Sequence, residues 1–346
     1  MEAWRLACWP ERIRKVDAAG RWVEFGNDIA RELKILDIEE FVEVLSHSLR
    51  EERGFNICAA VAATFVAVSS AARCPLVFDG HVPSSTTLHT FDTSNSSYSP
   101  THVKGNNLNW SSILLFPSLP TSKFDWASRS KAVEVTINNS SVFLSGGKNL
   151  QYGFRRAELV VGNGSDASNV GVKTFHWSNR QDESKGMNLS HEYMNVWHEA
   201  NDYASNQFSL NAGVMLDQDK PIGTGNGSVS GIGIERTFWK VLDRKNNVIW
   251  STSIILDEWQ NWGIVVDYVK NTLQVLYSES YDPLEAVTDP VPNDNSGGGQ
   301  FHVGILKKPT NTTSVVWDGY QESPIYEGQI YGGVFIEDSS RGCIST

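Results

Sequence analysis

From residue 74 onward, short apolar and aromatic runs alternate with turn residues about every ten positions. The runs are rich in Val, Ile, Thr, Phe, Tyr and Trp, which favour β-strands. The clearest lie at 132–137, 158–161, 237–242, 248–255, 262–268, 272–278 and 300–306. This pattern contains no internal repeat and no convincing long helix. It predicts an all-β fold, a jelly-roll β-sandwich of about 270 residues with an open groove on one sheet.

Three polar segments interrupt the apolar pattern and are expected to be loops. Residues 180–185 and 201–230 are rich in Asp, Asn, Gly and Ser, and we expect them to form walls of the groove. Residues 282–299 end in Asn-Asp-Asn-Ser and three glycines. Two interpretations of this last segment stay open: a flexible tip, or a loop that delivers the following strand to a site.

Residues 1–54 differ in character from the rest of the chain. Among many Glu and Arg residues, the apolar positions follow helical spacing. These positions are Ile29, Leu33, Leu36, Phe41, Val44 and Leu45. The segment is interpreted as an upstream extension, either a start codon placed too early or a genuine helical or disordered extension. No function is assigned to it.

Residues 55–72 have the three parts of a secretory signal peptide. The stretch is apolar and uncharged, follows Arg50 and Arg53, and ends in small residues. Cleavage after Ala72 would leave Arg73 first, so residues 73–346 are expected to form the mature β domain. A membrane anchor or a buried helix is the alternative, although the run is Ala-rich and barely long enough to span a bilayer.

Cysteine usage fits an exported protein. After residue 72 only Cys74 and Cys343 remain, near the two ends of the expected mature chain. We expect a disulfide between them, with two unpaired thiols as the alternative. Glycosylation sequons point the same way, towards a secreted, extracellular glycoprotein. They lie at Asn95, Asn109, Asn138, Asn139, Asn163, Asn188, Asn226 and Asn311.

The charge of the chain limits its partners. The formal net charge is −11, without a block of like charges. This argues against a nucleic-acid groove and against adhesion to an anionic membrane surface. A neutral polysaccharide is compatible with it. No two-histidine zinc motif, phosphate-cradling loop or serine nucleophile elbow is present, so we expect no metal and no cofactor. A monomer is expected.

The stretch 188–202 separates into two faces when it is read with the two-residue period of a strand. Met194 and Val196 resemble core. The opposite face combines polar groups, aromatic rings and a carboxylate, as binding and cutting a sugar chain would require. Its members are His191, Tyr193, Asn195, Trp197 and Glu199.

Two further strands carry candidate chemistry. Arg156 and Glu158 share one strand face, and Gln300 and His302 share another, opposite an apolar side. Two carboxyl groups across a glycosidic bond are the minimum needed to hydrolyse it, and Glu158 and Glu199 are the candidates. On pattern alone, a glutamate in a strand is usually a solvated surface residue, and a lone histidine such as His302 is usually a surface or hydrogen-bonded one.

Aromatic side chains supply the other expected sugar contacts. Trp177 and Trp197 are the tryptophans we expect to stack on sugar rings, although most tryptophans of a β-sandwich belong to its core. His176, next to Trp177, is an ambiguous candidate for substrate binding. The predicted substrate-binding set is Arg156, His176, Trp177, Tyr193, Asn195, Trp197 and Gln300.

Several segments, in order, resemble fungal glycoside hydrolase family 131 over roughly residues 74–338. They are Cys-Pro-Leu-Val-Phe-Asp-Gly at 74–80, Tyr-Gly-Phe-Arg-Arg-Ala-Glu-Leu at 152–159, Phe-His-Trp-Ser at 175–178, Leu-Ser-His-Glu-Tyr at 189–193, Val-Trp-His-Glu-Ala-Asn-Asp at 196–202, Asn-Asp-Asn-Ser-Gly-Gly-Gly-Gln-Phe-His at 293–302 and Leu-Lys-Lys-Pro at 306–309. The resemblance implies a secreted β-jelly roll with a wide glucan groove.

The same resemblance implies an activity. The family is expected to hydrolyse β-1,3, β-1,6 and β-1,4 glucans with inversion. Its two catalytic glutamates match Glu158 and Glu199, and an active-site histidine matches His302. Which glutamate is the acid and which is the base stays open, and the aromatic neighbours of Glu199 favour it as the acid. The alternatives are a non-catalytic glucan-binding lectin, a jelly-roll polysaccharide lyase using Arg156, His302 and Tyr193, and a structural wall protein.

Overall fold

The computed structural model describes residues 14–16, 22–24, 74–126, 128–161, 167–216 and 236–346. The chain divides into two units, residues 1–72 and residues 73–346. In the first unit, β1 (Arg14–Val16) and β2 (Trp22–Glu24) form an antiparallel pair. The helical pattern between residues 29 and 45 and the signal-like segment 55–72 lie outside the described residues and stay predictions.

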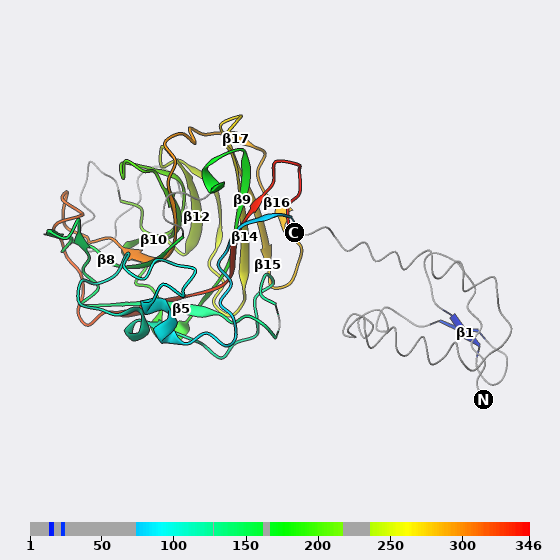
Figure 1. Cartoon of the computed structure of the whole chain (residues 1–346), viewed down its shortest axis with the longest axis horizontal. Coiled ribbons are helices and arrows are strands. Elements are labelled where there is room, and N and C mark those ends of the chain that lie inside the picture. The colour runs from blue at the N-terminus through cyan, green and yellow to red at the C-terminus, as the bar shows by residue number, and fades with distance from the viewer. Residues whose placement is uncertain (1–13, 17–21, 25–73, 127, 162–166, 217–235) are drawn as a thin grey trace. The chain divides into compact units, whose positions relative to one another are not determined.

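The second unit is a sandwich of two antiparallel sheets (Figure 1). The six-stranded sheet has the order β13-β12-β11-β10-β18-β8. Its strands are β8 (Arg155–Val161), β10 (Glu192–Glu199), β11 (Asn206–Gly213), β12 (Phe238–Asp243), β13 (Val248–Ser253) and β18 (Gln300–Lys307). The expected all-β jelly-roll sandwich is confirmed.

The larger sheet has the order β16-β15-β14-β9-β19-β5-β4, with β17 added on β15 and β3 on β19. Its strands are β3 (Leu76–Asp79), β4 (Leu114–Leu115), β5 (Val133–Asn138), β9 (Val172–Gln181), β14 (Gln260–Asp267), β15 (Thr272–Glu279), β16 (Glu285–Ala286), β17 (Val291–Pro292) and β19 (Tyr326–Asp338). The 13-residue strand β19 pairs with β9 on one side and β5 on the other.

Short elements complete the fold. β6 (Leu144–Ser145) and β7 (Asn149–Leu150) form a separate hairpin. Across the described residues, the helical elements are single 3-10 turns rather than α-helices. These turns are η1 (Leu88–Asp92), η2 (Trp110–Ser112), η3 (Ala167–Asn169) and η4 (Glu183–Lys185).

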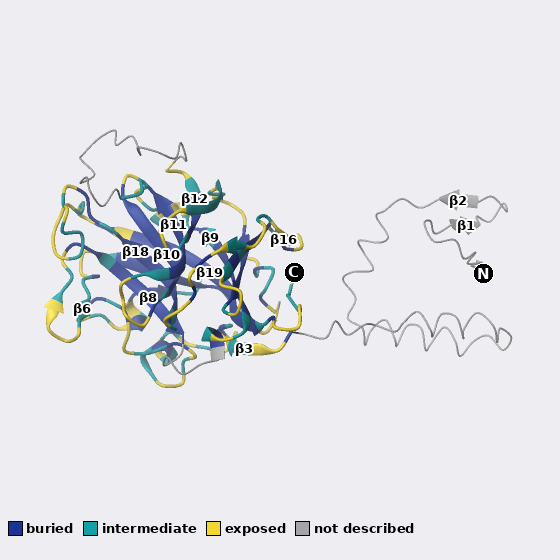
Figure 2. Ribbon diagram, turned by 90° about the horizontal axis from the view of Figure 1, so that it is seen from above, coloured by how far each residue is buried: buried dark blue, intermediate teal, exposed yellow. Residues whose placement is uncertain are grey.

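The main hydrophobic core lies between the two sheets, where the strands are buried (Figure 2). Alternate residues of each strand point into it, as the two-residue period of a strand requires. On β8 these are Ala157, Leu159 and Val161, and on β18 they are Phe301, Val303 and Ile305. The residues between them therefore lie on the side of the six-stranded sheet turned away from the larger sheet, which we call the outer face.

The prediction of a loop at 201–230 is wrong over residues 206–213, because Asn206–Gly213 is strand β11. Phe208, Leu210 and Ala212 of this strand point into the core. The polar residues between them occupy the other side, so the segment looks like a loop by composition but has the alternation of a strand. The rest of the expected loop, from 217, lies outside the described residues.

The expected disulfide is confirmed. Cys74 and Cys343 are bonded, with their Cα atoms 5.5 Å apart. The bond joins the segment that enters β3 to the segment that follows β19, and these two strands pair directly. The covalent bond and the strand pairing therefore hold the same two ends of the β domain together.

Candidate active site

Three neighbouring strands bring Glu158, His302 and Glu199 together on the outer face. Gly304 of β18 lies opposite Glu158 of β8, and Gln300 of β18 lies opposite Glu199 of β10. His302 stands between Gly304 and Gln300 on the same face of β18. Its imidazole therefore extends between the two carboxylates.

Arg156 fixes the carboxylate of Glu158. Its Nε donates to Oε1 at 2.6 Å and its Nη2 donates to Oε2 at 2.9 Å, while Nη1 donates to Gln151 at 3.0 Å. Glu158 is fully buried and Arg156 nearly so. Burial opposes the charge of the guanidinium, but the adjacent Glu158 carboxylate outweighs this effect and raises the pKa of Arg156. This forked pairing holds the Glu158 carboxylate in a fixed orientation.

His302 faces both carboxylates without a hydrogen bond to either. Its Nδ1 lies 3.7 Å from Oε2 of Glu158, and its Nε2 lies 3.5 Å from Oε2 of Glu199. Both ring nitrogens are buried and lack a hydrogen-bond partner. Buried polar atoms are nearly always paired, so an unpaired imidazole between two carboxylates marks a position where a ligand or water is expected to bind.

Trp197 positions His302. The two side chains lie opposite each other in the β10–β18 pair, and their rings stack with centroids 4.8 Å apart. The indole is almost fully buried and packs with Phe154, Met194 and Leu306. The prediction that Trp197 offers an open platform for a sugar ring is therefore wrong. The residue lies at the site, but its ring is buried and stacks on the imidazole of His302.

Gly304 permits the close pairing of β8 and β18 beside Glu158. A Cβ at this position would lie 2.2 Å from the carbonyl oxygen of Ala157 and 2.6 Å from the Cα of Glu158. Only glycine avoids this overlap. A sequence read by side-chain type does not single out Gly304, because its role is the absence of a side chain.

Tyr193 and Asn195 are not at the site, which corrects the face predicted for 188–202. The register of β10 shifts between Met194 and Val196, so the two-residue period does not continue through the strand. Before the shift, Tyr193 points into the core, where its hydroxyl donates to Glu327 at 2.9 Å. The amide of Asn195 donates to Gln329 of the larger sheet at 3.3 Å.

His176 and Trp177 lie on β9 of the larger sheet, also away from the site. Trp177 is fully buried in the main core and stacks on Trp262. His176 is fully buried on the opposite side of β9, where its Nε2 lies 2.8 Å from Glu337. Both side chains are buried in a different sheet from the one that carries Glu158, His302 and Glu199, so the substrate-binding roles predicted for them are wrong.

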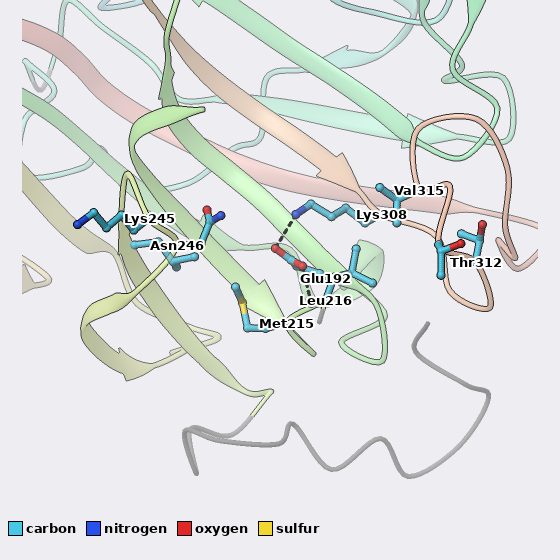
Figure 3. Close-up of a pocket in the computed structure, with 10 residues that line it drawn as sticks. Glu192, Met215, Leu216, Lys245, Asn246, Lys308, Thr312 and Val315 are labelled. Atoms are coloured by element: carbon cyan, nitrogen blue, oxygen red, sulfur yellow. Dashed lines mark hydrogen bonds and ion pairs between the residues drawn. The ribbon is translucent and has the colours of Figure 1, made fainter. Parts of the chain in front are cut away.

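A hollow of about 530 Å³ lies farther along the six-stranded sheet, around Glu192 of β10. Lys308 Nζ donates to Glu192 at 2.8 Å, and the backbone N–H of Leu216 donates to the same carboxylate (Figure 3). Met215 and Val315 supply apolar walls. No single sequence motif marks this hollow, because its lining residues come from separate strands and loops.

The described residues contain no group of three or more His, Cys, Asp or Glu side chains arranged to hold a metal ion. No helix among them has both the length and the apolar character needed to cross a bilayer.

Two carboxylates and a histidine brought together on one sheet are the residue types that hydrolysis of a glycosidic bond requires. Residues 76–342 match the profile of the glycoside hydrolase 131 catalytic N-terminal domain. The chain belongs to this family. It is therefore a glycoside hydrolase, as the resemblance of its segments indicates.

Two solved structures share the fold. The GH131 β-glucanase catalytic domain from Podospora anserina aligns with a TM-score of 0.58 at 19% identity, over 78% of this chain and 98% of that one. The catalytic domain of the glycoside hydrolase family 131 protein from Coprinopsis cinerea aligns with a TM-score of 0.56 at 20% identity, over 79% and 97%. No curated protein matches the sequence.

Proposed function

We propose that this enzyme is a secreted β-glucanase that hydrolyses β-1,3, β-1,6 and β-1,4 linkages, with Glu158 and Glu199 as its acid/base pair. The observation that carries the proposal is the placement of His302 between the two carboxylates, on the outer face of one sheet. The family membership and the solved β-glucanase with this fold support a glucan as the substrate.

The environments of the two glutamates support different roles. Glu158 is buried, and Arg156 donates two hydrogen bonds to its carboxylate oxygens. Glu199 keeps about a quarter of its side chain exposed. In the proposed reaction Glu199 donates a proton to the glycosidic oxygen as the bond to the anomeric carbon breaks. Glu158 takes a proton from the water that attacks that carbon.

The separation of the carboxylates supports inversion. Inverting glycosidases leave about 6.5–9.5 Å between their carboxyl groups, and retaining ones only about 5–5.5 Å. Here the width of an imidazole ring, with a contact of 3.5 Å on one side and 3.7 Å on the other, stands between the two carboxylates. This arrangement favours the wider spacing.

A product profile tests this proposal. Protein beginning near Cys74 is incubated with laminarin, pustulan, lichenan and cellulose, and reducing ends and the anomeric configuration of the first product are followed. The proposal predicts reducing ends from glucans of all three linkage types, with an inverted anomer. Retention on glucan without products would indicate a lectin, and unsaturated products that absorb in the ultraviolet would indicate a lyase. A retained anomer would overturn the inverting assignment.

The proposed working form is a monomer that needs no cofactor or metal and binds neither nucleic acid nor membrane after removal of the signal-like segment. The net charge of −11 and the Cys74–Cys343 disulfide support an exported enzyme that acts on a neutral polysaccharide. Activity in the presence of a chelator and elution at the monomer volume on a sizing column are the expected results.

A further inference from the structure

A second hollow of about 530 Å³ is lined by two exposed aromatic side chains. Tyr152 is 59% exposed and Trp317 is 48% exposed, whereas most large aromatic side chains of the domain are buried. The hairpin of β6 and β7 supplies the remaining wall. We call this site the aromatic hollow, lined by Leu144, Lys148, Asn149, Leu150, Tyr152 and Trp317.

The aromatic hollow is joined to the catalytic residues by a short chain of contacts. Gln151, adjacent to Tyr152, accepts a hydrogen bond from Arg156, and Arg156 in turn binds Glu158. The segment leading to Trp317 packs on the same cluster that supports His302. The segments that carry Tyr152 and Trp317 are therefore each connected to residues that hold Glu158 or His302.

Gly153 brings the two aromatic residues together. Its N–H donates to the carbonyl of Val316 at 3.1 Å, so the chain on either side of Tyr152 abuts the segment that ends in Trp317. A Cβ at Gly153 would lie 2.1 Å from the carbonyl oxygen of Val315 and 2.7 Å from that of Asp318. The close approach depends on glycine, as expected for a built site rather than a chance pairing of surface loops.

The chemistry of this hollow fits a neutral sugar ring. Aromatic rings present flat apolar faces, and Asn149 offers an amide donor and acceptor for hydroxyl groups. No carboxylate lines it, and Lys148 is its one charged side chain. A concave site with exposed rings and a few polar groups is the usual form of a small-ligand site.

We propose that the aromatic hollow is a binding subsite for glucosyl units of the glucan, beyond those at the scissile bond, with Tyr152 and Trp317 as its stacking platforms. This inference rests on the proposed glucanase function. It adds a reason why the enzyme would prefer long glucan chains to short ones. A substrate that reaches the hollow gains binding from it, and a shorter substrate does not.

The test compares Trp317→Ala and Tyr152→Ala with wild type on cellotriose, cellohexaose and laminarin. Binding is measured separately, as retention in a native gel containing laminarin. Each variant is expected to raise KM for laminarin and cellohexaose about tenfold, with a smaller change for cellotriose, because the lost contact is binding energy remote from the reacting bond. Trp317→Phe keeps an aromatic ring and is expected to restore most of the affinity.

Tyr281→Ala is the matched control, because Tyr281 is 61% exposed in the turn after β15 and donates a hydrogen bond to the backbone of Thr121, away from the hollow. It is expected to behave as wild type. Equal KM values and equal retention for Trp317→Ala and wild type at every chain length would overturn the subsite while leaving hydrolysis intact. If wild type is retained by laminarin but releases no reducing ends, and Trp317→Ala is not retained, the subsite stands and the proposed hydrolysis falls.

Discussion

The guanidinium of Arg156 binds both carboxylate oxygens of Glu158 across one face of β8, at 2.6 and 2.9 Å. The two residues are separated by a single position, so the two-residue period of a strand places them side by side. Both are buried, and the fork geometry matches the carboxylate in a way that a single ammonium group does not. The pair therefore fixes one of the two proposed catalytic carboxylates in place.

Arg156→Lys is expected to lower kcat on laminarin at least about tenfold, because lysine keeps the charge but loses the fork that orients Glu158. Steady-state kinetics check this, with Arg129→Lys as a control at an exposed position. A variant with unchanged kcat would show that the orientation of Glu158 by Arg156 does not matter for turnover.

His302→Ala is expected to lower kcat about tenfold to a hundredfold, with a smaller change in KM, because the imidazole spans the space between the two carboxylates. Trp197→Phe keeps an aromatic ring behind the imidazole and is expected to retain more activity than His302→Ala. His89→Ala, at a largely exposed histidine, serves as the control. Equal kinetics for His302→Ala and His89→Ala would remove His302 from the mechanism.

The double variant Cys74→Ser/Cys343→Ser is expected to lower the free energy of unfolding by about 2–5 kcal/mol, because the disulfide closes a loop with a sequence separation of 269 residues. Urea titrations without reductant measure the change. Activity well below the unfolding transition is expected to stay near wild type, since neither cysteine is at the site. An unchanged urea midpoint would contradict the stabilising role of the bond.

Glu322 is expected to stabilise the fold down to mildly acidic pH. Burial opposes its charge, but hydrogen bonds from Lys307 and Asn188 outweigh this and lower the pKa of Glu322 to about 2, from an ordinary value of 4.5. Because the folded-state pKa is the lower one, the stabilisation is present above about pH 4.5 and is lost as the pH falls toward 2.

Urea midpoints of wild type and Glu322→Gln at several pH values test this dependence. The difference between the two proteins is expected to be largest and constant above pH 5, and to shrink as the pH is lowered from 4.5. Glu285→Gln, at an exposed edge strand, controls for the loss of one charge. A difference that does not vary with pH would show that the ionisation of Glu322 does not contribute to stability.

The sequence predicted which residues share a strand face wherever the two-residue alternation of the strand continues without a break. Arg156 and Glu158 share a face in the structure as expected, and so do Gln300 and His302, because β8 and β18 keep a regular period through these positions. The disulfide was also predictable, since only two cysteines remained in the expected mature chain.

The sequence did not predict what depends on register or on tertiary contacts. Because the register of β10 shifts after Met194, the side chains of Tyr193 and Asn195 point towards the larger sheet. The residue types in this strand do not predict the shift. Trp177 and Trp197 look alike as aromatic residues of polar strands, and only the packing shows that both are buried. Tyr152 and Trp317 are far apart along the chain, and the close contact of Gly153 with the segment before Trp317 brings them together.

The most direct test of the account is the turnover of Glu158→Gln and Glu199→Gln on laminarin, measured beside Glu285→Gln and with folding checked by thermal unfolding. Each of the two active-site variants is expected to lose at least about a hundredfold in kcat, because loss of a positioned acid or base costs about 10²–10⁴. Wild-type release of reducing ends by either folded variant would exclude that glutamate from the reaction and contradict the proposed pair.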